Sequence, residues 1–254
     1  MYFLRQLSFL FFLFILMESQ AQQIIHIPNK DLVDSTDGYN FTVNANAHFT
    51  QNINDIFSTG NQFNGLYVKN KSRLMLMHDY NLTIFNGNAI VNNSFQHLRY
   101  GYAISKTTTL EAFVQTQFNE IINIKFRGLT GAGARFELLK KDKFSLVYGT
   151  IMMLEYEEET EFPEINRAIR ASNYLSLGVD VFKNMHVDLI SYYQPDILLW
   201  EDYRFNVEAV IQFRLSNRLS FSLIHAYFYD SRPPKNIRRN FYNFRNGLTY
   251  RFRD

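Results

Sequence analysis

Apolar and polar side chains alternate with a period of two along most of this chain, and this alternation constrains its fold more than any other feature. The segment 201–214 shows it most cleanly. Its apolar positions are Tyr203, Phe205, Val207, Ala209, Ile211 and Phe213. Successive side chains of a strand point to opposite faces of a sheet. The pattern therefore predicts strands with one apolar face and one mostly polar face.

Twelve such segments follow one another. They are 39–49, 55–69, 72–84, 94–104, 108–118, 127–139, 143–156, 171–182, 185–194, 201–214, 218–229 and 240–252. Most exceed the ~5–6 residues usual for soluble strands and suit the ~9–11 residues with which a tilted strand crosses a bilayer. Barrel closure removes the sheet edges and pairs every backbone group. The predicted fold is all-β, a transmembrane antiparallel up-and-down β-barrel of about 12 strands, with 10 or 14 as alternatives.

Short and long connections alternate from the second segment onward. The short, polar ones are Asn70-Lys71, Ser105-Lys106-Thr107, Lys140-Lys141-Asp142, Lys183-Asn184 and Ser216-Asn217. The long ones are 85–93, 119–126, 157–170, 195–200 and 230–239. Outer-membrane barrels have short periplasmic turns and longer external loops. We therefore expect the long connections outside the cell and the short ones in the periplasm.

One long apolar run lies at the start of the chain. Arg5 precedes an apolar core at 7–17, and Ser19 and Ala21 supply small residues at the positions that a signal peptidase recognises. An uncleaved anchor helix is the alternative, but the core is shorter than the ~20 residues that span a bilayer. The predicted organisation is a signal peptide at 1–21, a periplasmic N-terminal segment at 22–38 and an outer-membrane β-barrel domain at 39–254.

The last segment carries a second pattern related to export. Its residues are Arg245, Gly247, Leu248, Tyr250 and Phe252, in the order polar, glycine, apolar, apolar and aromatic. They resemble the C-terminal signal that barrel-assembly machinery recognises, although Arg253 and Asp254 follow the aromatic residue that usually comes last. We expect this machinery and outer-membrane lipid as partners, and the outer membrane of a Gram-negative bacterium as the location.

The polar faces of the strands carry charges of both signs. In a barrel these residues would face the lumen: Arg99, Glu111, Arg127, Arg135, Glu137, Asp180, Asp188, Arg204, Glu208, Arg214, Arg245 and Arg251. Buried charges must pair or stay in contact with water. A lumen with unpaired arginines would favour our first hypothesis, a narrow channel for small polar solutes or ions. A lumen in which every arginine meets a carboxylate would favour the second, a structural or stress-related envelope barrel with a plugged lumen.

An outer-membrane enzyme is the third hypothesis, and the sequence offers it little support. The chain contains no His-x-Ser, the arrangement that an outer-membrane phospholipase would need, and adjacent Glu201 and Asp202 point to opposite faces. The six histidines lack metal-binding spacing and there is no cysteine, so we expect neither a metal nor a cofactor. A net charge of +2 gives no field that would attract nucleic acid. No pattern indicates a particular solute or oligomeric state.

Three local patterns have ordinary structural explanations. The cluster Gly128, Gly131 and Gly133 lacks the Lys-Ser/Thr of a phosphate loop and is expected to make room for long lumen side chains. The acidic run at 155–161 is expected to be a solvated loop, with a divalent-cation site as the alternative. His186 and Asp188 share a strand face, and a hydrogen-bonded pair in the lumen is expected there.

Residues 94–158 resemble a known bacterial family. The resemblance is carried by Leu98-Arg99-Tyr100-Gly101-Tyr102, by Arg127-Gly128-Leu129-Thr130-Gly131-Ala132-Gly133-Ala134-Arg135-Phe136, by Tyr148-Gly149 and by Glu155-Tyr156. These residues are similar to the salt-induced outer-membrane proteins, a domain family of unknown function, and a looser likeness covers 41–215. The resemblance implies a barrel in the outer membrane and carries over no catalytic or binding residue.

Overall fold

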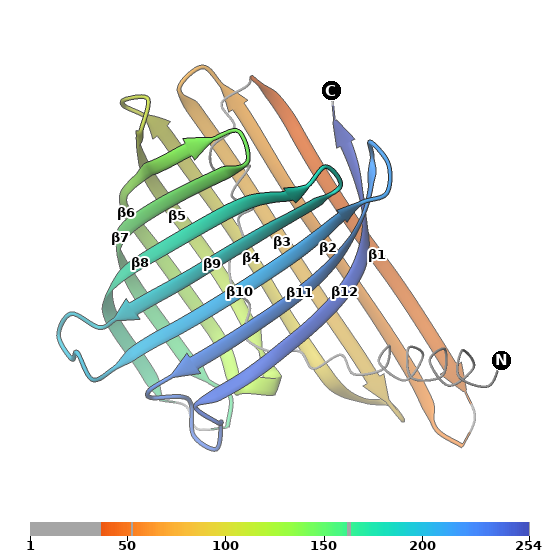
Figure 1. Ribbon diagram of the computed structural model, residues 1–254. Helices are drawn as coiled ribbons and strands as arrows, with labels where there is room; N and C mark the ends of the chain where they lie inside the picture. Colours follow the sequence, from red (N-terminus) through yellow and green to blue (C-terminus); the bar gives the residue numbers. More distant parts are fainter. Residues whose placement is uncertain (1–36, 52, 162–163, 254) are drawn as a thin grey trace, which may run out of the picture.

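Twelve strands follow one another in the part of the chain that the structure describes, in agreement with the predicted number (Figure 1). The structure is a computed structural model that describes residues 37–51, 53–161 and 164–253. The strands are β1 (Gly38–Gln51), β2 (Asp55–Lys69), β3 (Ser72–Phe85), β4 (Asn88–Ala103), β5 (Thr108–Asn119), β6 (Ile124–Lys141), β7 (Phe144–Glu159), β8 (Ile165–Phe182), β9 (Met185–Pro195), β10 (Tyr203–Arg214), β11 (Leu219–Asp230) and β12 (Asn240–Arg253). A 3-10 helix, η2 (Glu120–Ile122), lies between β5 and β6. The predicted signal peptide lies outside the described residues.

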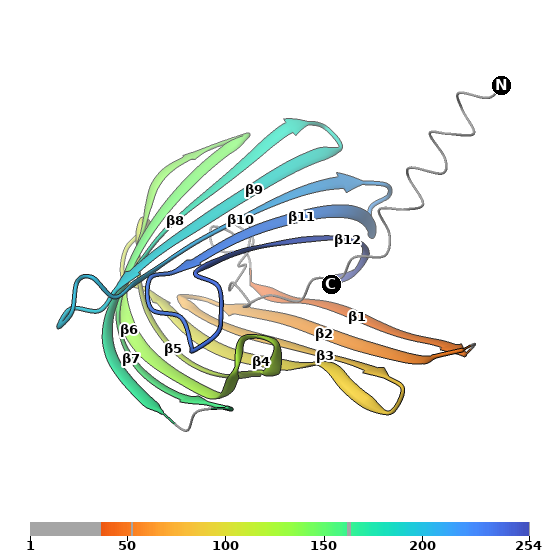
Figure 2. The same cartoon turned by 90° about the horizontal axis from the view of Figure 1, so that it is seen from below.

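Each strand pairs antiparallel with its sequence neighbours, and β1 pairs with β12 to close the barrel. This closing contact, called the seam below, joins Asn40, Phe41 and Thr42 to Arg253, Phe252 and Arg251. In contrast, all 14 residues of β1 pair with β2. Figure 2 shows β1 and β12 diverging beyond the seam. In the part of the chain that the structure describes, no helix has the length and apolar character needed to cross a membrane.

At one barrel end, called the loop end, the connections after β3, β5 and β7 are shorter than predicted. Between β3 and β4 only Asn86 and Gly87 remain of the predicted loop 85–93. Both have positive φ, 47° and 81°, as a two-residue hairpin turn requires. The Asn-Gly pair is a strong sequence signal for a hairpin turn, but a prediction from apolar and polar alternation alone does not use it.

The connections at the loop end are longer than those at the opposite end only in the second half of the chain. There the loop-end connections are 160–164, 196–202 and 231–239. The opposite end, called the turn end, has connections of two to four residues throughout. The predicted loop 157–170 is wrong because β7 and β8 both extend into it.

The outward faces of the strands are apolar and exposed. Members of this surface include Leu76, Leu98, Tyr100, Val114, Leu154 and Phe244. Leu154, for example, keeps 54% of its surface exposed. Soluble monomers rarely expose contiguous apolar surface on this scale. A closed sheet with this outer surface is suited to a lipid environment.

Tyrosines gather on the outer surface near the loop end. Tyr203, at the start of β10, lies between Tyr193 of β9 and Tyr229 of β11, with ring centroids 5.7 and 5.5 Å apart. Tyr227 of β11 similarly contacts Tyr242 of β12 at 5.1 Å. Aromatic girdles of this kind mark the boundary between lipid and water in membrane barrels.

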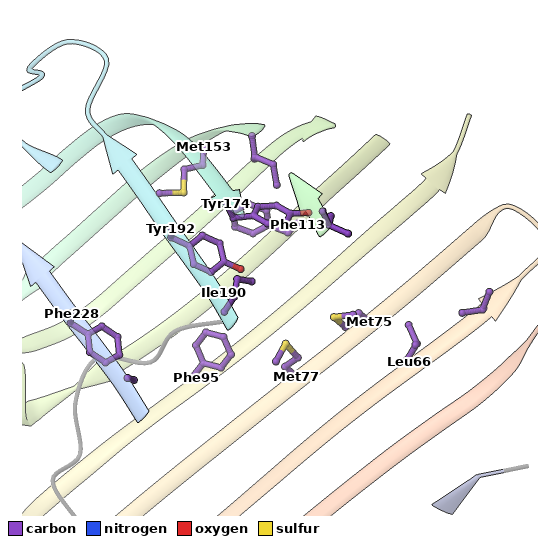
Figure 3. Close-up of a cluster of buried hydrophobic side chains, with 14 residues drawn as sticks. Leu66, Met75, Met77, Phe95, Phe113, Met153, Tyr174, Ile190, Tyr192 and Phe228 are labelled. Carbon is purple, nitrogen blue, oxygen red and sulfur yellow. The ribbon is translucent and has the colours of Figure 1, made fainter. Parts of the chain in front are cut away.

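The interior holds an apolar cluster contributed by β2 to β5, β7 to β9 and β11. Its members are Leu66, Val68, Met75, Met77, Phe95, Phe113, Val147, Ile151, Met153, Tyr174, Ile190, Tyr192, Ala226 and Phe228. Figure 3 shows them pointing into the space between the walls. The sequence pattern predicted mostly polar inward faces. The structure shows that these faces also carry many apolar side chains.

Candidate functional site in the barrel interior

The structure buries seven of the twelve charged residues that the sequence placed in the lumen. They are Arg99, Glu111, Arg127, Arg135, Asp188, Arg204 and Glu208. Glu137 and Arg245 are half-buried, and Asp180 and Arg214 are exposed near the turn end. The Arg251 side chain lies outside the described part of the chain.

One buried network centres on Glu111 of β5. Its carboxylate accepts a hydrogen bond from Arg99 Nη1 at 3.1 Å and one from the Tyr174 hydroxyl at 2.8 Å. Arg135 Nη1 lies 3.4 Å from the other carboxylate oxygen. Two guanidinium groups therefore share one carboxylate. The network also continues to His97, whose Nε2 accepts from Arg99 Nε at 3.3 Å.

A second network, nearer the loop end, centres on Glu155 of β7. Its carboxylate contacts Arg204 Nη1 at 2.5 Å and Arg170 Nε at 2.6 Å, and lies 3.6 Å from Arg127 Nε. Glu157, two residues along the same face, pairs with both Arg127 and Arg204.

Two further carboxylates complete this second network. Arg204 Nε donates to Asp230 at 2.8 Å, and Arg170 Nη1 donates to Asp202 at 3.0 Å. Three arginines thus meet four carboxylates, and these seven residues come from five strands and one loop. Such contacts are strong when every partner is hydrogen-bonded, and removal of one partner is costly.

The expectation that the acidic run at 155–161 is a solvated loop was wrong. Glu155, Glu157 and Glu159 are buried on the inward face of β7. These glutamates follow Ile151 and Met153 at every second position of β7, so they face inward as those residues do. The period of two predicts this direction, although the residue type changes from apolar to acidic. Arginines occupy the Glu155 and Glu157 carboxylates, and among the described residues no group of His, Asp or Glu forms a metal site.

Tyr174, Arg170 and Asp230 also belong to the networks, although the sequence did not indicate them. Arg170 lay in a predicted loop, one residue before the predicted strand, and Asp230 lay just past another predicted strand. Tyr174 was hidden because an aromatic residue on a strand is normally assigned to the apolar face.

Tyr174 reaches Glu111 across the lumen because Gly149 leaves space for its ring. A Cβ atom at position 149 would lie 2.1 Å from Tyr174 Cε1. Gly131 is similarly restricted, with Phe113 at 2.8 Å and Ile151 at 2.9 Å from its ideal Cβ. The predicted role of making room for lumen side chains fits Gly131, whereas a Cβ at Gly133 would meet the backbone of Thr150 and one at Gly128 would meet only the Phe126 ring.

Gly149→Ala should therefore destabilise the refolded barrel by about 1–3 kcal/mol, the usual range for overpacking. The Tyr174 ring is fully buried and tied to Glu111, so it has no free direction in which to move. Urea unfolding in lipid vesicles measures the effect. Gly247→Ala is the matched control, because nothing lies within 4 Å of its ideal Cβ. Equal stabilities for the two variants would contradict this packing.

His186, near the turn end, contacts two carboxylates. Its Nδ1 lies 2.7 Å from Asp180 and its Nε2 lies 3.2 Å from Asp188. His186 and Asp188 therefore lie within ion-pair distance as expected, but the hydrogen bond of His186 is made with Asp180. Arg245 of β12 lies 3.5 Å from the fully buried Glu208 of β10.

Two cavities open at the turn end, and Lys140 lines both. The first has a volume of about 380 Å³ and extends from the turns after β2 and β4 to Arg135 and Val147. The second, about 280 Å³, lies beside His186 and the turn after β10. The interior is therefore hollow at its turn end, and the network around Glu155 lies farther toward the loop end.

These features define a class: a twelve-stranded up-and-down β-barrel with an apolar outer surface and an interior occupied by ion pairs and packed side chains. Within that class, the chain belongs to the family described as "Protein of unknown function, DUF481", which matches residues 61–252. The family description does not include the name salt-induced, which stays a prediction. No curated protein matches the chain.

Solved structures of outer-membrane barrels resemble the fold. The NanC porin has a TM-score of 0.50 and 8% identity, covering 84% of this chain and 98% of its own. A bacterial polysaccharide outer membrane secretin has a TM-score of 0.46 and 7% identity, covering 85% and 96%. The KdgM porin has a TM-score of 0.39 and 8% identity, covering 84% and 96%. At this identity the likeness to the NanC porin shows the fold alone.

Proposed function

We propose that the protein spans the outer membrane as an envelope barrel whose lumen is closed by its own side chains. The exposed apolar band and the tyrosines at the loop end support a position in lipid. Partnership with barrel-assembly machinery is part of the proposal. Leu248, in the suggested assembly signal, is exposed, and the Phe252 backbone pairs with Phe41 at the seam.

The pairing of the lumen arginines carries the closed-lumen proposal. Each of six has a carboxylate within ion-pair distance: Arg99, Arg127, Arg135, Arg170, Arg204 and Arg245. Contacts such as Tyr174 to Glu111 and Arg204 to Glu155 join strands that are not neighbours, so they cross the lumen. The apolar cluster occupies the same interior. This is the arrangement expected of a plugged barrel.

A narrow channel is the second candidate, and the turn-end cavities favour it. They provide a vestibule from which a small polar solute could reach Arg135. Passage beyond that point would require the cross-lumen contacts to separate. The two candidates therefore differ in whether the barrel conducts without a stimulus.

Single-channel recording of the refolded barrel in a planar bilayer separates them. We expect no stable conductance steps from the wild-type protein at low voltage. Tyr174→Ala should produce steps, because it removes the side chain that crosses from β8 to Glu111. Tyr100→Ala, which truncates an outward tyrosine, is the control and should stay silent. Steady openings of the wild-type barrel would reject the closed lumen and favour the channel.

A further inference from the structure

We propose that the larger turn-end cavity is a binding site for a phosphate-type anion. Five cationic side chains line it and only one acidic side chain does. The cationic residues are Lys71, Arg73, Lys106, Arg135 and Lys140, and the acidic one is Glu137. They come from the turns after β2 and β4 and from strands β3 and β6, so the folded sheet is needed to bring them together.

Arg135 forms the inner part of this site, and its guanidinium group is held in place before any ligand binds. It is 5% exposed, and its Nη2 donates to Thr109 at 3.2 Å, which fixes the plane of the guanidinium. Its Nη1 is buried and forms no hydrogen bond, although Glu111 lies 3.4 Å away. Because Arg99 already hydrogen-bonds Glu111, the carboxylate balances only one of the two arginines. An anion in the cavity would offset the remaining charge.

Lys71 and Lys106 stand at the mouth of the same cavity. Within the described residues neither lysine forms an ion pair, whereas Lys140 lies 3.9 Å from Glu137. Hydroxyl and amide groups of Asn70, Thr107 and Thr109 add hydrogen-bond donors to the lining. A ligand with several anionic oxygens would satisfy this excess of donors, because charge-assisted hydrogen bonds are the strong ones.

The size of the cavity restricts the ligand to a small one. A volume of about 380 Å³ lies at the lower end of the range for small-molecule sites. Inorganic pyrophosphate or the headgroup of an anionic phospholipid presents the required chemistry. The inference goes beyond the proposed function, since anion binding at the turn end requires neither a closed nor an open lumen.

The test uses the full chain refolded in maltoside micelles, which contribute no phosphate. Isothermal titration with inorganic pyrophosphate is one arm, and titration with micelles containing phosphatidylglycerol is the other. Binding of pyrophosphate identifies a soluble phosphate as a sufficient ligand, whereas heat from phosphatidylglycerol alone identifies the lipid headgroup. The absence of binding in both arms overturns the proposal.

Paired variants locate the binding. The double variant Lys71→Gln, Lys106→Gln should weaken binding at least about tenfold, since each lost hydrogen bond to a charged group is significant. The control double variant Lys69→Gln, Lys183→Gln removes the same charge from the same barrel end without touching the cavity. It should leave the affinity unchanged. Equal weakening by both double variants would show attraction by overall charge and reject a site. Arg135 is kept, because its loss would also disturb Glu111.

Discussion

Glu155→Ala should destabilise the barrel by about 3–5 kcal/mol, the usual cost of removing one partner from a buried ion pair. The Glu155 carboxylate contacts Arg204 and Arg170 directly and also lies near Arg127. All three guanidinium groups are almost completely buried. Without Glu155, Arg204 would retain Glu157 and Asp230, but Arg170 would retain only Asp202. Three carboxylates would remain for three arginines, but the guanidinium N–H groups that now contact Glu155 would be left buried without an acceptor.

Urea unfolding of the barrel in lipid vesicles, followed by the fluorescence of its single tryptophan, measures this loss. Glu158→Ala is the matched control, because Glu158 lies three residues along the same strand on its other face. Glu158 pairs at 2.6 Å with Lys125, whose side chain remains 60% exposed. Water screens such a pair, so its removal should change stability little. Similar losses for the two variants would mean that the Glu155 network is dispensable.

Ala209→Arg should destabilise the barrel by roughly 2–4 kcal/mol, because it would place a charge on the lipid-facing surface near the bilayer centre. Ala209 lies in the middle of β10, opposite Leu189 of β9 and His225 of β11. Its neighbours Glu208 and Val210 are buried on the inward face. Urea unfolding in vesicles again gives the magnitude.

A spin label at position 209 identifies the surroundings directly. We expect strong relaxation by oxygen, which dissolves in lipid, and weak relaxation by a water-soluble nickel complex. A label at Leu198, 76% exposed in the loop after β9, should respond in the opposite way. Strong relaxation by nickel at position 209 would place that face in water and remove the membrane-spanning assignment.

The number of strands and most of their faces could be predicted from the sequence because the alternation is local. The segment around Ala209 is an example, since residue type alone assigns its outward face. In β3 the same reasoning fails. Met75 and Met77 point inward while Leu74 and Leu76 point outward, so both faces are apolar and the period carries no information about direction.

The partners of the lumen charges could not be predicted, for a different reason. Arg204 and Glu155 come from strands that do not pair with each other, and Tyr174 reaches Glu111 from three strands away. Such contacts depend on register, on barrel curvature and on the space left by Gly149. A single strand's sequence contains none of these quantities. The predicted list therefore contained most of the arginines but missed Glu155, Glu157 and Asp230.

The short seam has a consequence for the order in which the barrel forms. Every other strand pair joins sequence neighbours and can grow from a hairpin, whereas the seam joins opposite ends of the chain. Non-local pairing is slow because loop closure must precede any gain from the contact. We expect the pairs of sequence-neighbouring strands to form first, as hairpins, and the pairing of β1 with β12 to form last. Until then, β1 and β12 present free edges, and this is the stage at which one chain is most exposed to pairing with another.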